Sequence, residues 1–138
     1  MIPSGYCVCD FIDPFEEHVG PLCFKEHAGQ LCFAFEAQPH HCNSSGFLHG
    51  GMLMTFADFA LCLAATWGLP NESAVTVSFN CELTAPGRSG DFVESVAEVV
   101  ARTGSLTFVR GQIYVADRTL MNYSGIVKRV STPSSIGT

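Results

Sequence analysis

Basic residues are scarce in this sequence. Lys and Arg together number seven in 138 residues, and the formal net charge is −6 at pH 7. A nucleic-acid-binding protein usually presents a basic face, and seven cations spread along the chain do not supply one. The composition therefore argues against nucleic-acid binding, and any anionic ligand has to be held by local groups.

Signals for export and membrane insertion are also lacking. No basic segment followed by an apolar run stands at the N-terminus, as a signal peptide would require. The longest apolar stretch, residues 50–69, contains Asp58 and is marginal as a bilayer span. We therefore expect a cytoplasmic protein with no membrane partner.

The seven cysteines form no recognisable framework. Their number is odd, their spacing is irregular and no CxxC pair occurs, so a disulfide scaffold is not indicated. The segment His40–Cys42 and His49 contain metal-capable groups, but their spacing matches no common zinc pattern. We predict no metal site.

What the chain does contain is enough apolar material for one core, since 47% of its residues are hydrophobic. Residues 1–20 form a leader, in which Asp13 and Pro14 suit the start of a short helix that Gly20 and Pro21 end. We expect the folded domain over residues 21–130 and a flexible tail over residues 131–138.

Periodicity and chain-breaking residues predict the elements of the domain. A hairpin over residues 22–37 and a polar loop over 40–46 precede a helix over 51–66, which is apolar on nearly every face. Four alternating segments follow, over residues 75–83, 91–101, 105–116 and 119–130. This order indicates an α+β fold, with one antiparallel sheet wrapped around one buried helix. A single sheet covers only part of such a helix, and a second copy of the chain is the simplest cover for the rest.

Asp58 is the residue that most needs an explanation. It lies about two turns into the apolar helix, where an ionised carboxylate must be paired, protonated or facing a cavity. Thr55 and Cys62, three residues before and four after, share one less apolar stripe with it. A structural Asp, hydrogen-bonded or paired with an Arg, is an equal alternative from this position alone.

The start of the same helix carries His49, Gly50 and Gly51. Its first turn leaves free N–H groups at the positive end of the helix dipole, which can polarise a carbonyl. The glycines could instead merely permit a tight turn. Asn43, in the preceding loop, could bind a water or a carbonyl through its amide, or could be an ordinary loop residue.

Together, the run N43-x5-H49-G50-G51-x6-D58 ahead of a long apolar helix resembles the hotdog-fold acyl-CoA thioesterases of the phenylacetate-pathway (PaaI-like) group. The segments SAVTVSFNCELTAPGRSGD and GSLTFVRGQIYVADRTLMNYSGIVKR are similar to strands of that group, and the resemblance covers about residues 20–130. It implies a homodimer, often assembled into a homotetramer, with each active site at the subunit interface.

The resemblance also implies roles for individual residues. Asp58 of one subunit would attack the thioester or activate water, while Gly50 and Gly51 of the other would polarise the thioester carbonyl. Asn43 would hold the water or thioester and His49 would orient the substrate.

Thr76 would lie near the water. The phosphates of coenzyme A, which is part of the substrate and not a cofactor, need cations or N–H groups, and Arg88, Lys128 and Arg129 are the candidates.

Two other functions remain open on the same fold. Hotdog enoyl-thioester hydratases also act on acyl thioesters, but they usually combine a His with a carboxylate, whereas here His49 directly precedes the two glycines. A non-catalytic acyl-CoA-binding sensor is the second alternative, although a pure binder has no need of a carboxylate at position 58.

Overall fold

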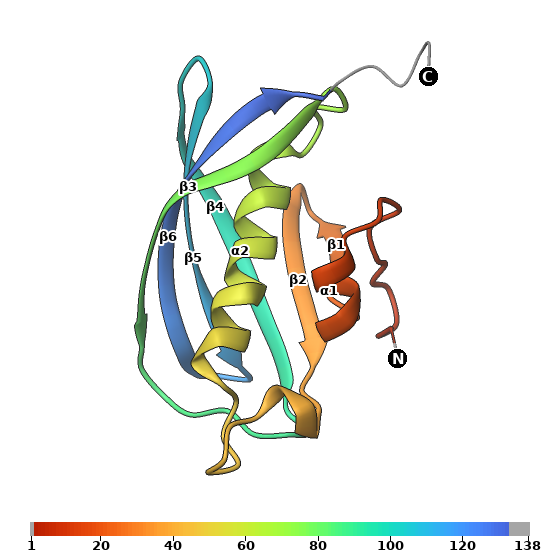
Figure 1. Cartoon of the computed structure of the whole chain (residues 1–138), viewed down its shortest axis with the longest axis vertical. Helices are drawn as coiled ribbons and strands as arrows, with labels where there is room; N and C mark the ends of the chain where they lie inside the picture. The colour runs from red at the N-terminus through yellow and green to blue at the C-terminus, as the bar shows by residue number, and fades with distance from the viewer. Residues whose placement is uncertain (1, 133–138) are drawn as a thin grey trace.

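The computed structural model describes residues 2–132. Its elements follow the predicted order of a short helix, a hairpin, one long helix and four strands (Figure 1). The bounds are α1 Pro14–Val19, β1 Cys23–His27, β2 Gln30–Glu36, a 3-10 helix Pro39–His41, α2 Gly50–Thr66, β3 Glu72–Leu83, β4 Phe92–Arg102, β5 Leu106–Val115 and β6 Arg118–Ser131.

All six strands form one antiparallel sheet in the order β1-β2-β4-β5-β6-β3. The sheet curves around α2, which lies along its concave face (Figure 1). Phe56 and Leu61 of α2 are fully buried, as are Phe33 and Ile113 of the sheet. Each such side chain contributes about 1.5–3 kcal/mol through burial. The predicted α+β architecture is confirmed, and this packing fixes the position of every residue on α2.

One stripe of α2 stays uncovered. Met54 is 39% exposed, Gly51 is exposed, and Thr55, Asp58 and Cys62 are partly buried. These residues recur at the three- and four-residue spacing of a single helix face. The sheet and the leader thus leave this face open in a single chain, in line with the expectation that one sheet covers only part of the helix.

The described part of the leader, residues 2–20, is attached to the domain at both of its ends. Near its start, Cys7 exchanges two backbone hydrogen bonds of 2.8 and 2.9 Å with Phe24 of β1. Helix α1 begins as predicted, with Asp13 Oδ1 accepting a 3.0 Å hydrogen bond from the Glu16 N–H. At the end of α1, His41 Nε2 lies 2.6 Å from the Val19 carbonyl oxygen.

His41 corrects one sequence-based expectation. The polar loop predicted over residues 40–46 begins instead as a 3-10 turn, and His41 is only 3% exposed. Its Nδ1 accepts a hydrogen bond from the Gln38 N–H, so the ring proton is on Nε2 and is donated to Val19. Burial lowers the pKa of His41 and keeps the ring neutral in this role.

Strand β3 is an edge of the sheet, and among the described residues it pairs only with β6. A bulge between Thr76 and Ser78 inserts Val77 and shifts the register against β6. Val75 and Val77 are 48% and 53% exposed, whereas Thr76 points toward α2, as its contact with Asp58 shows. A long, apolar and unpaired edge of this kind is a template for pairing with another strand.

The remaining predictions on organisation concern the ends of the chain. Ser131 ends β6, and residues 133–138 of the predicted flexible tail lie outside the described residues. The division into leader, domain and tail stays a prediction. Within residues 2–132, no helix is both long and apolar enough to cross a bilayer.

Candidate active site

Asp58 projects from the open stripe of α2 and meets one side chain of β3. Thr76 Oγ1 donates a hydrogen bond of 2.5 Å to Asp58 Oδ1. Bonds from a hydroxyl to a carboxylate are short and about twice as strong as neutral ones. The structure therefore brings together the two predicted residues Asp58 and Thr76, and it holds one carboxylate oxygen in a fixed direction.

Cys62 completes this contact one turn further along α2. Its Sγ lies 3.3 Å from Thr76 Oγ1 and 4.0 Å from Asp58 Oδ1. Burial, together with the neighbouring Asp58, raises the pKa of the Cys62 thiol to about 12. The thiol thus stays protonated and supports the carboxylate as a weak donor, and it is not a nucleophile at neutral pH.

A cavity of about 670 Å³ opens in front of Asp58. Its walls come from the second half of α2, the first residues of β3 and, on the third side, the leader with Phe11 and Glu16. A smaller hollow of about 420 Å³ lies beside it, where Phe15 and Glu16 face Met54, Thr55 and Asp58. Asp58 is therefore reachable from solvent, as a catalytic carboxylate must be.

The leader's share in this cavity is absent from the sequence-based prediction. The leader has little periodicity, so its side chains could not be assigned to a face. The available signal was the presence of Phe11, Ile12 and Phe15 in a segment that supplies no strand to the sheet.

Glu16 is the leader's titratable group in the cavity. Burial raises the pKa of Glu16 to about 7, and the nearby carboxylates Asp13 and Asp58 add to the shift. At neutral pH the Glu16 side chain is therefore partly protonated and partly ionised.

The start of α2 is where the sequence predicts free backbone N–H groups, at the positive end of the helix dipole. His49 is the N-cap, and its Nδ1 accepts a 2.8 Å hydrogen bond from the Gly51 N–H. The Met52 N–H bonds to the His49 carbonyl oxygen at 2.9 Å. Within the described chain the Gly50 N–H has no such partner, so it is the open donor at the positive end of the helix.

Asn43 lies in the loop that leads to this helix start. Its Oδ1 accepts hydrogen bonds from the Ser45 and Phe47 N–H groups at 2.9 and 3.2 Å. The side-chain oxygen therefore holds the loop, which leaves the exposed amide NH₂ as the group that can face a ligand.

The helix start and the carboxylate are too far apart to act together within one chain. Seven residues separate Gly51 from Asp58, a rise of about 10 Å along an α-helix. A thioester carbonyl on Gly50 would be out of reach of Asp58 of the same chain. The structure thus groups Asp58 with Thr76 and groups Gly50, Gly51, His49 and Asn43 at the other end.

The three cations predicted to bind phosphate differ in their surroundings. Arg88 is exposed beside the loop before α2, with its guanidinium 4.6 Å from the centroid of the Phe47 ring. Lys128 is exposed on β6. The side chain of Arg129 is only 9% exposed, and it pairs with Glu72 at 3.3 Å and donates to the Gly104 carbonyl oxygen at 2.7 Å. Arg129 therefore fastens the turn between β4 and β5.

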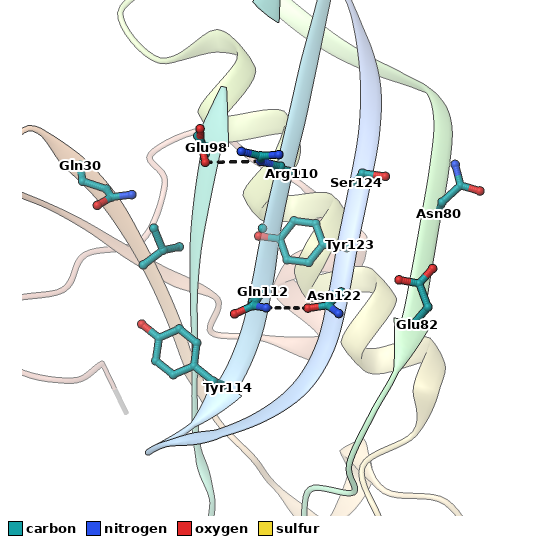
Figure 2. Close-up of a pocket in the computed structure, with 12 residues that line it drawn as sticks. Gln30, Asn80, Glu82, Glu98, Arg110, Gln112, Tyr114, Asn122, Tyr123 and Ser124 are labelled. Carbon is teal, nitrogen blue, oxygen red and sulfur yellow. Dashed lines mark hydrogen bonds and ion pairs between the residues drawn. The ribbon is translucent and has the colours of Figure 1, made fainter. Parts of the chain in front are cut away.

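A second hollow, of about 660 Å³, lies on the face of the sheet that points away from α2 (Figure 2). Four of its polar side chains form two pairs: Arg110 with Glu98 at 3.4 Å, and Gln112 with Asn122 at 2.7 Å. The sheet separates it from Asp58. Within residues 2–132, no three His, Cys, Asp or Glu side chains are grouped so that they could hold a metal ion.

Comparison with known proteins identifies the family to which this chain belongs. Residues 45–122, more than half of the chain, match the thioesterase superfamily. A Pseudomonas aeruginosa protein, PA0474, whose name assigns it only provisionally to the esterases, is 28% identical over 127 residues, 91% of this chain and 95% of that protein. The solved structure of a point mutant of the phenylacetic acid degradation protein PaaI from Thermus thermophilus is 29% identical, with a TM-score of 0.75 over 86% of this chain and all of that one.

The fold recurs in the BH2602 protein of Bacillus halodurans, solved with CoA. The TM-score is 0.78 at 21% identity, over 91% of this chain and 83% of that one. The predicted resemblance is thereby confirmed. The helix wrapped by an antiparallel sheet and the match over residues 45–122 place this chain in the thioesterase superfamily, whose members are thioester hydrolases with the hotdog fold.

Proposed function

We propose that this protein hydrolyses acyl-CoA thioesters to the free acid and coenzyme A, with Asp58 as the catalytic carboxylate. The observation that carries the proposal is the carboxylate of Asp58, held by Thr76 at 2.5 Å and open to a cavity of about 670 Å³. The CoA bound to the Bacillus halodurans protein of the same fold supports an acyl-CoA as substrate. The reaction needs no cofactor and no metal.

The complete site is built from two copies of the chain. The free β3 edge, with Val75 and Val77 exposed, suits antiparallel pairing with the β3 of a second subunit. A twofold axis at this edge reverses the direction of the second α2. The start of that helix, with Gly50 and Gly51, then approaches Asp58. We propose this homodimer as the functional unit and expect dimers to pair into a homotetramer.

The chemistry requires a positioned carboxylate and a donor for the oxyanion. The thioester carbonyl oxygen accepts from the Gly50 N–H of the second copy, where the helix dipole stabilises developing negative charge. Asp58 removes a proton from water as the water oxygen attacks the carbonyl carbon. Collapse of the tetrahedral intermediate breaks the carbon–sulfur bond and leaves the carboxylic acid. Coenzyme A departs as a thiolate, which takes up the proton from Asp58 and so restores the carboxylate. Direct attack by Asp58, through an acyl anhydride that water then opens, uses the same groups.

The residues at the helix start orient the substrate. We assign this role to the Asn43 amide NH₂ and to His49 Nε2–H, since both residues have their other polar side-chain atom engaged in the loop and the helix cap. We assign the CoA phosphates to Arg88, which is exposed beside the same loop, with the exposed Lys128 as a second candidate.

Asp58→Asn tests the proposal. It keeps the shape of the side chain but removes the base or nucleophile, so we expect kcat for acyl-CoA hydrolysis to fall by about 10²–10⁴-fold. Thermal unfolding and acyl-CoA binding should change little. Asp117→Asn, in the exposed turn before β6, is the matched control and should retain wild-type turnover.

A wild-type protein that releases no thiol from short, long or aromatic acyl-CoAs, yet binds them, would instead be a sensor. Hydration of an enoyl-CoA without thiol release would identify a hydratase. Full hydrolytic activity in Asp58→Asn would contradict the assignment of Asp58.

A further inference from the structure

We propose that the leader forms a wall of the acyl-binding subsite, and that Phe11 and Glu16 select acyl groups that are apolar and carry no charge. This inference rests on the proposed hydrolysis of acyl-CoA and adds the class of acyl group. It makes Phe11 and Glu16 specificity-determining residues rather than catalytic ones.

The cavity beside Asp58 has the dimensions of a ligand subsite. Its volume of about 670 Å³ lies within the range of roughly 300–1,000 Å³ typical of small-molecule sites. Phe11 of the leader lies on one side, and Phe59 and Leu63 of α2 and Ala74 of β3 lie on the others. An acyl group whose carbonyl is at Asp58 would therefore run between apolar side chains of the leader and of the helix.

The leader is held in place firmly enough to act as a wall. Its first anchor is the pair of backbone hydrogen bonds between Cys7 and Phe24. The Tyr6 ring packs edge-on against Phe92 with centroids 6.2 Å apart, and the Lys25 ammonium lies 4.6 Å from the Tyr6 centroid. With the hydrogen bond from His41 to the end of α1 as its second anchor, the segment that carries Phe11 is fixed on both sides.

Two adjacent apolar residues of the leader differ in their relation to the cavity. Phe11 is 56% exposed and lines the cavity, whereas Ile12 is 80% exposed and lines none of the cavities described above. Covering the exposed face of Phe11 with an apolar acyl group removes that surface from water and favours binding in proportion to the area covered. Ile12 gives a matched control in the same segment.

The charge of the cavity wall is the second property that selects the acyl group. Asp13, Glu16 and Asp58 all line the cavity, and no Lys or Arg of the described chain does. The remaining acid there, Glu72, is neutralised by Arg129 at 3.3 Å. An acyl group ending in a carboxylate would meet only like charge and would leave its own charge without a partner. Acyl groups without a charge avoid both costs.

The apolar part of the inference is tested by comparing hexanoyl-CoA with acetyl-CoA. In the full-length protein, Phe11→Ala should lower kcat/KM for hexanoyl-CoA by roughly 10-fold, because a large apolar contact is lost. Its kcat/KM for acetyl-CoA should change by less than about twofold, and Ile12→Ala should leave both values unchanged. Equal effects of Phe11→Ala on the two substrates, or equal effects of Phe11→Ala and Ile12→Ala, would overturn this wall.

The charge part is tested with hexanoyl-CoA and its ω-carboxylated analogue adipoyl-CoA. Wild type should prefer the neutral substrate, and Glu16→Gln should narrow the ratio of kcat/KM values several-fold at pH 8. Glu17→Gln, the exposed neighbour on α1, should leave the ratio as in wild type. A ratio that Glu16→Gln does not change, or equal wild-type rates for both substrates, would refute the exclusion of charge.

A binding measurement separates this inference from the proposed function. S-hexyl-CoA, a thioether that cannot be hydrolysed, should bind more tightly than S-methyl-CoA in calorimetry, and Phe11→Ala should remove most of that difference. If wild type hydrolyses no acyl-CoA, the proposed function fails while this binding difference still decides the role of the leader. If wild type binds S-hexyl-CoA and S-methyl-CoA equally tightly, the acyl subsite is rejected even if hydrolysis is found.

Discussion

Thr76→Val is the most direct test of how the carboxylate of Asp58 is held. The substitution keeps the β-branched shape but removes the hydroxyl that lies 2.5 Å from Asp58 Oδ1. A hydrogen bond to a charged group contributes about 1.5–3 kcal/mol. If the proposed transition state needs the carboxylate in this direction, kcat should fall by about 10- to 150-fold, since about 1.4 kcal/mol corresponds to a factor of ten.

The assay should separate turnover from binding and from folding. Thiol release gives kcat and KM, and KM should change little because Thr76 acts on Asp58 and not on the substrate. Loss of the same hydrogen bond should also lower the free energy of unfolding, by up to about 3 kcal/mol. Turnover is therefore compared under conditions in which urea titration shows the variant to be fully folded. Thr76→Ser keeps the hydroxyl and should retain turnover within a few-fold.

Cys62 makes the test sharper. Its thiol lies 3.3 Å from Thr76 Oγ1 and 4.0 Å from Asp58 Oδ1, so it can donate weakly to the carboxylate once the hydroxyl is gone. Cys62→Ala should therefore cost more turnover in the Thr76→Val background than in wild type. Wild-type kcat in Thr76→Val, or an equal loss in Thr76→Ser, would refute the proposed role of the hydroxyl.

Two further predictions concern stability. The folded-state pKa of Glu16, about 7, lies above its ordinary value of 4.5, so the native state binds this proton more tightly and loses stability as pH rises from 4.5 through 7. Glu16→Gln should remove that loss and, after solvent screening, have a free energy of unfolding about 1 kcal/mol higher than wild type at pH 8. This difference should disappear near pH 4.5. A difference in urea stability that stays constant from pH 4.5 to 8 would contradict the prediction. The fully buried Thr107 hydroxyl has no hydrogen-bond partner among the described residues, so Thr107→Val should raise the free energy of unfolding by about 1 kcal/mol in urea titrations, and a loss of stability would contradict this account.

The sequence predicted the elements of the domain because each has its own local signal. The strands alternate, the helix lacks β-branched residues over most of its length, and Gly or Pro marks the ends. The resemblance to a family placed Thr76 near the proposed water, but its hydrogen bond to Asp58, eighteen residues away in the chain, is seen only in the structure. Local pattern alone left a structural Asp equally open.

Features that depend on tertiary packing were not accessible from local pattern. The alternation from Val75 to Leu83 continues without interruption in the sequence, yet the bulge at Val77 changes the side that each residue faces. His41 reads as part of a polar loop, but its ring is buried because the Val19 carbonyl oxygen needs a donor. The leader's place beside Asp58 depends on such contacts and on no periodicity of its own.

The geometry of α2 explains why the proposed active site needs two chains. The helix carries its acid and its open N–H donor, Gly50, about 12 Å apart along its axis, so the two cannot act on one carbonyl within one chain. In the proposed homodimer, a second α2 reversed across the β3 edge would exchange these positions and bring each acid to the other copy's donor. The face of α2 that the sheet and leader leave open contains Gly51 and Asp58 together, which is the face that such a twofold pairing requires. Separation of the proposed dimer into monomers should therefore abolish hydrolysis, while Asp58 and Thr76 stay in contact within each chain.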